Sequence, residues 1–304
     1  MLQALLSRLR TLRAPRSPSG RAQQLQHDAE RLYAVLNNSA SNPSVEQLAH
    51  TLNKHLQHEV HRVFHATYKA LLDGSTPLQT GVQLRLGYVP LVQSSRVQGA
   101  GNGLFVRGEA RAGSLLAVFP GLFFNMSDVP SQLSDLAIAR YDGVIIDSSH
   151  PISINVPSQQ QDERGNDVAT GQMEHPFATA HYANHGMPNA LQFMIDVPRN
   201  SLPSHMYDLV PVRAAPKQRS MLSILDKWAD LAFIQRVSGS ELYTKQGEHV
   251  LKTVGLLALR DIHDGEEIRF NYRFNPQAKQ LPHWYTDPEP EVSKRRWQQS
   301  SVLW

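Results

Sequence analysis

The stretch VGLLALRDIHDGEEIRFNY occupies residues 254–272. It begins with an apolar run, turns through polar residues up to Gly265, and continues with a second apolar run. This order predicts a strand, a turn and a second strand. Tyr272 ends the stretch between Phe270 and Phe274, where a lone tyrosine would ordinarily be a packing residue.

Outward from this stretch, residues 82–275 alternate short runs of Val, Leu, Ile and Phe with Gly, Pro, Asn and Ser. The expected strands are Leu84–Leu91, Leu104–Arg107, Leu115–Phe119, Val144–Asp147, Leu191–Asp196 and Val250–Leu259. Residues 158–172 are polar and predict a loop, whereas residues 219–237 carry apolar side chains at helical spacing and predict an inserted helix. Many short strands with one inserted helix predict an α+β domain with several small sheets.

Residues 22–81 read as a helical extension in front of this domain. Apolar periodicity predicts a first helix over residues 22–37. A second helix is expected to start at Ser44, with Gln47 completing a capping box, and to close at Gly74. We expect the two helices to form an N-terminal hairpin that packs on the following domain.

The second helix carries a stripe of histidines, His58, His61 and His65. They lie within about 60° of one another around the helix axis. Three imidazoles in this arrangement can bind a metal ion. The stripe faces away from the apolar side, however, so a solvated polar face is the favoured interpretation and no metal site is predicted.

Residues 1–21 form a basic amphipathic tail. Leucines recur there at helical spacing, and residues 1–27 contain five arginines and no acid. Pro15 and Pro18 are expected to end any helix in the tail. This composition is typical of a mitochondrial transit peptide. The alternative is a frayed basic terminus, with the protein in the nucleus or the cytoplasm.

The charge of the whole chain of 304 residues is +3, so the chain without its five tail arginines carries −2. A body of this charge is unlike a nucleic-acid groove, and no direct nucleic-acid binding is expected. No apolar run reaches the roughly 18 residues that a membrane span requires, so no membrane partner is expected. The sequence has no cysteine, which excludes disulfides, thiolate zinc sites and a cysteine nucleophile.

Three glycines stand at alternate positions in Gly99–Phe105, just before an expected strand. Bare backbone of this kind allows a ligand to approach closely. The spacing is not the dinucleotide fingerprint, and no Gly-Lys-Ser/Thr follows, so neither a dinucleotide site nor a phosphate loop is predicted. On its own, such a segment is more often a tight turn.

Residues 181–189 read HYANHGMPN and form a second polar segment. His181 and His185 are four positions apart, but the glutamate of the zinc-protease motif is missing and Pro188 argues against a helix. If Asn184 and His185 are buried, their side chains need hydrogen-bond partners.

These three segments, in this order, resemble the SET-domain family of protein lysine methyltransferases. Gly-Leu-Phe-Val at 103–106 resembles the family's first motif, and Asn-His-x-x-Pro-Asn at 184–189 resembles its Asn-His-Ser-x-x-Pro-Asn signature. Arg-Asp-Ile-x-x-Gly-Glu-Glu-Ile at 260–268, followed by Phe-Asn-Tyr, resembles its closing motif. Together the motifs frame residues 85–275.

The resemblance implies a β-rich SET fold of several small sheets, whose C-terminal segment is threaded beneath a preceding loop. The SET domain would span 82–275, with an insert at about 197–249 where related enzymes carry a substrate-reading segment. Residues 276–304 would be a C-terminal tail without the cysteines of a zinc-binding post-SET segment.

The resemblance also implies S-adenosylmethionine as cofactor and a protein substrate with an exposed lysine as partner. In this interpretation the backbone at Gly101, Asn102 and Gly103 lines the methionine end of the cofactor. Asn184 and His185 fix its adenine and amino-acid parts.

Tyr272 would place its hydroxyl at the floor of the lysine channel, as the main catalytic residue and as part of the cofactor site. Tyr141 is a weaker candidate for a second channel tyrosine, and a stacked surface tyrosine is the favoured alternative. Trp284 and Tyr285 follow the closing motif and would either cover the cofactor or form a hydrophobic plug that holds the tail.

The sequence departs from the family pattern at three places. Asn271 stands where the family often has Asp, Gly186 and Met187 replace Ser-Cys, and the post-SET cysteines are absent. The main alternative is therefore a SET-type cofactor-binding or interaction module without activity. A third hypothesis is a mitochondrial RNA-associated protein that acts through its basic arm.

Overall fold

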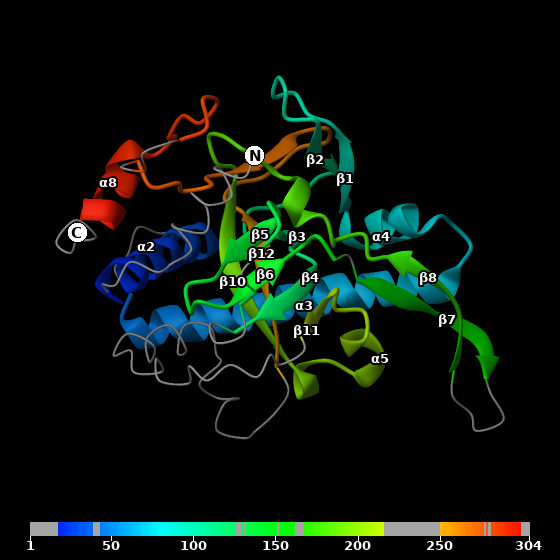
Figure 1. Cartoon of the computed structure of the whole chain (residues 1–304). Helices are drawn as coiled ribbons and strands as arrows, with labels where there is room; N and C mark the ends of the chain where they lie inside the picture. The colour runs from blue at the N-terminus through cyan, green and yellow to red at the C-terminus, as the bar shows by residue number, and fades with distance from the viewer. Residues whose placement is uncertain are drawn as a thin grey trace.

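The computed structural model arranges the chain as helices around several small sheets (Figure 1). The described residues are 18–38, 43–125, 129–130, 132–150, 152–161, 167–215, 250–276, 278 and 281–298. The inserted helix predicted at 219–237 and residues 1–17 of the tail lie outside this part of the chain. Within it, no helix combines the length and the hydropathy that crossing a membrane requires.

The first described helix, α2, spans Pro18–Asn37. The tail helix that Pro15 and Pro18 were expected to end would lie among residues 1–17, outside the described part of the chain, and α2 itself begins at Pro18, four residues before the expected start. Proline is tolerated in the first turn of a helix, where its missing N–H would have had no partner. Leu25 and Leu32 are fully buried, so the predicted apolar face of this helix is packed.

The second helix, α3, spans Val45–Asp73 and has the caps that its sequence predicts. The Gln47 N–H donates to Ser44 Oγ at 3.2 Å, and the Ser44 N–H donates to Gln47 Oε1 at 2.9 Å. Gly74 closes the helix in the left-handed conformation, with φ of 58°. Such caps satisfy backbone groups that a helix leaves without partners at its ends.

The apolar residues of α3 belong to the same buried cluster as the β-strands. The helix contacts α2, the short helix α4 and strand β3 (Leu115–Val118), and Figure 1 shows it running across much of the molecule. The helical extension and the β body therefore share one hydrophobic core, rather than each burying a core of its own.

The short helix α4 spans Leu78–Leu86 and corrects part of a predicted strand. We expected a strand over Leu84–Leu91, but its first three residues are helical and the strand begins only at Tyr88. Gly87 separates the two elements in a left-handed conformation, with φ of 87°. The glycine therefore ends a helix and does not interrupt a strand.

The strands form four sheets in the described part of the chain. The first has the order β1-β2-β13-β9, with β1 at Tyr88–Ser94, β2 at Asn102–Gly108, β13 at Glu267–Phe270 and β9 at Asn184–His185. The second has the order β10-β12-β3, with β10 at Ala190–Pro198 and β12 at Val250–Ala258. The third has the order β11-β4-β6-β5, with β11 at Val212–Ala214, β4 at Gly121–Phe124, β6 at Ile145–Asp147 and β5 at Ala137–Ala139. The mixed architecture with several small sheets is confirmed.

The fourth sheet corrects the loop that we expected over residues 158–172. β7, at Ser153–Gln161, pairs antiparallel with β8, at Asp167–Glu174, as a hairpin that Figure 1 shows extending away from the other sheets. The expectation failed because a strand ladder is built from backbone groups. Polar side chains in the sequence therefore do not prevent strand pairing.

The first sheet brings the three motifs together. β13 lies between β2 and β9, with Ile268 opposite Leu104 and Arg269 beside Asn184. The closing motif thus lies between the strand that follows the glycine turn and the segment that carries Asn184.

Candidate active site

Asn184 occupies the point where the three motifs meet. Its Nδ2 lies 2.9 Å from Ser95 Oγ, 3.1 Å from the carbonyl oxygen of Asn102 and 3.2 Å from Glu267 Oε1. Glu267 Oε1 also accepts from Ser95 Oγ at 2.6 Å. We call Ser95, Asn184 and Glu267 the Asn184 node. Through it, the glycine turn is tied to both other motifs.

Glu267 is the only charged member of the node, and its side chain is almost fully buried. Burial raises the pKa of this carboxyl, but hydrogen bonds from Ser95, Arg269 and Asn184 outweigh that effect and lower it. The Arg269 guanidinium lies 2.9 Å from Glu267 Oε2. Glu267 is therefore an ionised acceptor around which the neighbouring segments are fixed.

The glycines of the turn have different roles. A Cβ on Gly103 would lie 2.6 Å from Glu267 Oε1 and 3.2 Å from Asn184 Nδ2, so this glycine makes room for the node. Gly101 has φ of 71°, and a Cβ there would meet no atom within 4 Å. Gly101 and Asn102 are exposed, and their carbonyl oxygens accept from the Ser95 N–H at 2.8 Å and from Asn184 Nδ2.

Asn189, the last residue of the second motif, fastens that motif to the closing one. Its Nδ2 donates to Glu266 Oε1 and to the Glu267 carbonyl oxygen, each at 2.9 Å. Its Oδ1 accepts from the Arg269 N–H at 2.8 Å. An Arg260 hydrogen bond lowers the pKa of Glu266 to about 2, so this second carboxylate of the closing motif is also ionised.

Tyr272 is bound at both its backbone and its hydroxyl. The hydroxyl donates to the Ala183 carbonyl oxygen at 2.9 Å, and the Tyr272 N–H donates to His185 Nδ1 at 3.2 Å. His185 Nε2 donates to the Thr286 carbonyl oxygen at 2.8 Å. Burial lowers the pKa of His185, which keeps Nδ1 available as an acceptor.

The tail returns to this tyrosine. The ring of Trp284 lies edge-on to Tyr272 at 6.2 Å between centroids, and Tyr285 stacks on His185 at 4.5 Å. Phe274 contacts Tyr285 at 4.9 Å. Trp284 remains 51% exposed, so it covers the tyrosine from the solvent side. Asn102, Asn184, His185, Tyr272 and Trp284 are therefore linked through contacts around the Asn184 node and Tyr272, whereas Tyr141 is not among them.

A second network lies on the other side of Tyr272. Arg273 donates from Nη1 to Asp28 Oδ2 at 2.6 Å and from Nη2 to Asp28 Oδ1 at 2.7 Å. Nη1 also lies 2.7 Å from the Tyr141 hydroxyl, which is itself hydrogen-bonded to Asp28. We call Asp28, Tyr141 and Arg273 the Arg273 clasp.

The clasp corrects the interpretation of Tyr141. We expected a stacked surface tyrosine, but the residue is 9% exposed and its hydroxyl contacts a buried ion pair. Sequence reasoning also missed Asp28. One signal could have indicated it, because Asp28 falls on the apolar stripe of α2 between Leu25 and Leu32, where a charge needs a buried partner.

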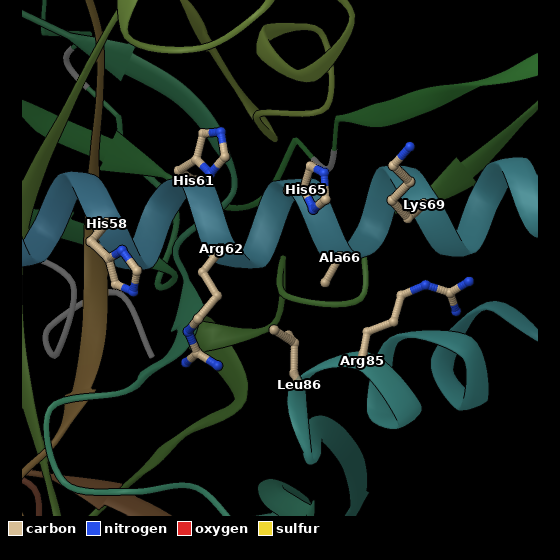
Figure 2. A pocket seen from close by; sticks show the side chains of 8 residues that line it. All are labelled: His58, His61, Arg62, His65, Ala66, Lys69, Arg85 and Leu86. Carbon is tan, nitrogen blue, oxygen red and sulfur yellow. The ribbon is translucent and has the colours of Figure 1, made fainter.

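The histidine stripe of α3 lies apart from these networks. His58, His61 and His65 line a hollow of about 450 Å³ between α3 and α4, together with side chains such as Lys69 and Arg85 (Figure 2). The three histidines are exposed, as a solvated polar face requires. Among the described residues, no cluster of histidines and acids has the geometry of a metal site.

Comparison with known proteins gives matches among solved structures. No family profile and no curated protein sequence matches this chain. One structure is described as KRYPTONITE in complex with mCHH DNA, an H3(1-15) peptide and SAH; it has 14% identity and a TM-score of 0.31, with 66% of this chain and 26% of that chain covered. Another is ctPRC2 in an autoinhibited conformation bound to S-adenosylmethionine, with 12% identity and a TM-score of 0.30, covering 68% of this chain and 18% of that one.

This chain thus spans only about a quarter or less of the length of these structures. Both TM-scores lie below 0.5. In the order of its three motifs, the chain resembles the SET-domain methyltransferases.

Proposed function

We propose that this chain is a SET-type protein-lysine N-methyltransferase that uses S-adenosylmethionine. The observation that carries the proposal is the Asn184 node, which joins the glycine turn, the Asn-His segment and the closing motif within hydrogen-bond distance. Tyr272 is bonded to Ala183, the residue directly before Asn184. Three segments that lie far apart in the sequence therefore form one site.

The residues present fit the cofactor. Gly101 and Asn102 are exposed, and the space beside Gly101 is open, as a bound nucleoside with a charged amino-acid end requires. We place Gly101, Asn102, Gly103, Asn184 and His185 against the cofactor, with Trp284 as the cover that a zinc-clasped segment would otherwise supply. When bound, the cofactor supplies an electrophilic methyl group on a sulfonium.

The active site must keep the amine of the substrate lysine neutral and align it with the methyl group. A free lysine has a pKa near 10.4, so deprotonating it at pH 7 costs about 4.6 kcal/mol. Burial among the rings around Tyr272 and the nearby positive charge of the cofactor favour the neutral amine. The Tyr272 hydroxyl, held by Ala183, orients the amine, and alignment contributes several kcal/mol more in well-oriented cases.

We propose the SET domain limits at 82–275 and a threaded path for the segment after β13. The support is that Tyr272 contacts Ala183 and His185, while the next residue, Arg273, is held by Asp28 and Tyr141. The chain therefore passes between partners from distant segments, as a threaded strand would.

Two measurements test the main proposal. Calorimetric titration of S-adenosylmethionine into the full chain should show one site, and no binding would reject the cofactor assignment. Tyr272→Phe should keep that binding and lose most methyl transfer to mixed protein substrates, whereas unchanged turnover would remove Tyr272 from the mechanism. Binding without any turnover in the wild type would support the alternative, an inactive SET-type interaction module.

One departure from the family pattern has a local explanation. Asn271 Nδ2 donates to Glu289 Oε2 at 3.1 Å, and its Oδ1 accepts from the Arg273 N–H at 2.8 Å. An aspartate at this position would place two carboxylates against each other. The amide therefore suits this chain and does not by itself argue for lost activity.

The mitochondrial location is a separate proposal, and it rests on the composition of the tail. A fluorescent fusion of residues 1–25 should enter mitochondria, and a diffuse signal would reject it. Deleting residues 1–22 should abolish RNA binding if the chain acts through its basic arm, the hypothesis that the charge of −2 elsewhere disfavours.

A further inference from the structure

Tyr272 is flanked by two buried polar residues. Asn271 is 4% exposed and Arg273 is 8% exposed. Asn271 is hydrogen-bonded to Glu289, and Arg273 to Asp28. The position of the tyrosine between them is therefore set from two sides.

The partner on one side is Asp28 of α2. Its two carboxylate oxygens accept from the two Nη atoms of Arg273, and Oδ1 also accepts from Gln24 Nε2 at 3.1 Å. Asp28 has no exposed surface. A bidentate pair of this kind fixes the orientation of a guanidinium as well as its distance.

Arg273 needs such a restraint because its backbone is left-handed, with φ of 56°. This conformation is unfavourable for a residue with a Cβ and persists only where the surroundings impose it. The side chain of Asn271 accepts from the Arg273 N–H, and Asp28 and Tyr141 hold the far end of the arginine. Together they impose the turn that directly follows Tyr272.

The partner on the other side also leads back to α2. Glu289, which accepts from Asn271, pairs through Oε1 with Arg31 Nη1 at 2.6 Å. Arg31 follows Asp28 by three residues and lies on the same side of α2. Helix α8, at Pro290–Gln298, contacts α2 as well, and the two lie side by side in Figure 1.

We infer that α2 is a positioning element for Tyr272, and that Asp28 is a positioning residue that acts through Arg273. This inference rests on the proposed function for its consequence in turnover. Its structural part, that Asp28 sets the environment of the Tyr272 ring, can be measured without any activity.

The competing explanation is that the clasp only stabilises the fold. A second buried Arg–Asp pair separates the two explanations, and it is a strict control because its arginine directly precedes Tyr141 in the chain. Arg140 pairs with Asp196 at 2.5 Å and with Asp142 at 3.0 Å, and the side chains of Arg140 and Asp196 are fully buried. Asp196 belongs to β10, so Asp196→Asn weakens a buried Arg–Asp pair without changing a residue of the clasp.

The experiment places 3-fluorotyrosine at position 272 of the full chain and records its ¹⁹F NMR signal in the wild type, in Asp28→Asn and in Asp196→Asn. We expect Asp28→Asn to shift or broaden the signal, and Asp196→Asn to leave it in place at a similar loss of thermal stability. If Asp28→Asn does not fold, Arg273→Lys replaces it. Lysine keeps the charge but cannot form the bidentate pair, so the signal should still shift.

An unmoved ¹⁹F signal in a folded Asp28→Asn or Arg273→Lys protein would overturn the inference, as would an equal shift in Asp196→Asn. Where the wild type transfers methyl groups, turnover of Asp28→Asn at saturating cofactor should fall about tenfold or more, with cofactor affinity changed far less. If the wild type does not bind S-adenosylmethionine, the proposed function fails while the ¹⁹F result still decides the role of Asp28.

Discussion

The two polar networks near Tyr272, the Asn184 node and the Arg273 clasp, are built from different chemistry. The Asn184 node, before the tyrosine in the closing motif, uses one carboxylate that several short side chains and backbone groups share. The Arg273 clasp, after the tyrosine, uses one guanidinium and one carboxylate in a bidentate pair. The node joins strands of one sheet, whereas the clasp joins α2 to a segment 245 residues further along the chain.

This difference predicts how each network responds to the loss of one of its members. The node distributes its hydrogen bonds over many partners, so losing one leaves others in place. The clasp concentrates its interaction in a single buried pair, and a buried charge whose partner is removed is far costlier than a lost hydrogen bond between neutral groups. We therefore expect the clasp to be the more sensitive side.

The largest effect should come from removing the clasp arginine. Arg273→Met leaves the carboxylate of Asp28 buried without its charged partner and should lower the free energy of unfolding by about 3–5 kcal/mol. Glu267→Gln in the node keeps the shape and one acceptor, and should cost about 1–2 kcal/mol. Denaturant unfolding of both variants measures the two values. A larger loss for Glu267→Gln would reverse the comparison.

The second effect is a loss of stability in acid. It is expected from His175 and His181, which precede Asn184 in the chain. Burial lowers the pKa of His175 to about 3 and that of His181 to about 4. The folded state thus keeps both neutral, and their contribution is complete above the unfolded pKa near 6.5 and falls as the pH drops toward the folded values. A fully buried histidine should cost about 2 kcal/mol at pH 5.

Thermal unfolding at pH 7.5 and pH 5.0 measures this loss. The matched variant is His175→Asn, because the asparagine oxygen can still accept from the Phe177 N–H that His175 Nδ1 binds at 3.1 Å. The variant should lose less stability between the two pH values than the wild type. The clasp contains no histidine and so adds no imidazole to this effect. An equal loss of stability in both proteins between the two pH values would show that the loss does not arise from His175.

Of the node, only Asn184 was predicted as a site residue, because it lies in a short segment with a fixed internal order. Glu267 was expected only as part of the closing motif, and Ser95, which precedes the glycine turn, was missed. Asn184, Gly103 and Tyr272 were expected at one site, and the structure brings them together. Local rules also succeeded where a few neighbouring residues decide the outcome, as in the capping box of Ser44 and Gln47.

The clasp could not be predicted, because its three members come from three distant segments and none belongs to a motif. Asp28 is marked only as an acid on an apolar stripe, which shows that a partner is needed but not which one. The same limit applies to Leu84–Leu86, where apolar residues before Gly87 suit a strand or a helix, and the pairing of β1 with β2 decides where the strand begins.

A smaller effect should follow from restoring the family's aspartate beside the clasp. Asn271→Asp replaces the amide that donates to Glu289 by a second carboxylate, and should cost about 1–2 kcal/mol at neutral pH. Adding Glu289→Gln restores a donor opposite the new carboxylate, so the double variant should recover part of the loss. Denaturant unfolding of the two single variants and the double variant gives the coupling. Additive losses would show that these two side chains do not interact.

The smallest effect compares two glycines of the turn. Gly101→Ala should cost about 1 kcal/mol, because its positive φ disfavours a Cβ although the space beside it is open. Gly103→Ala should cost about as much or slightly more, through a different cause, since its methyl group would press on Glu267 and Asn184. Only Gly103→Ala should therefore lose its effect when Glu267→Ser opens space in the node. If the cost of Gly103→Ala is unchanged in that background, the glycine serves the backbone and not the node.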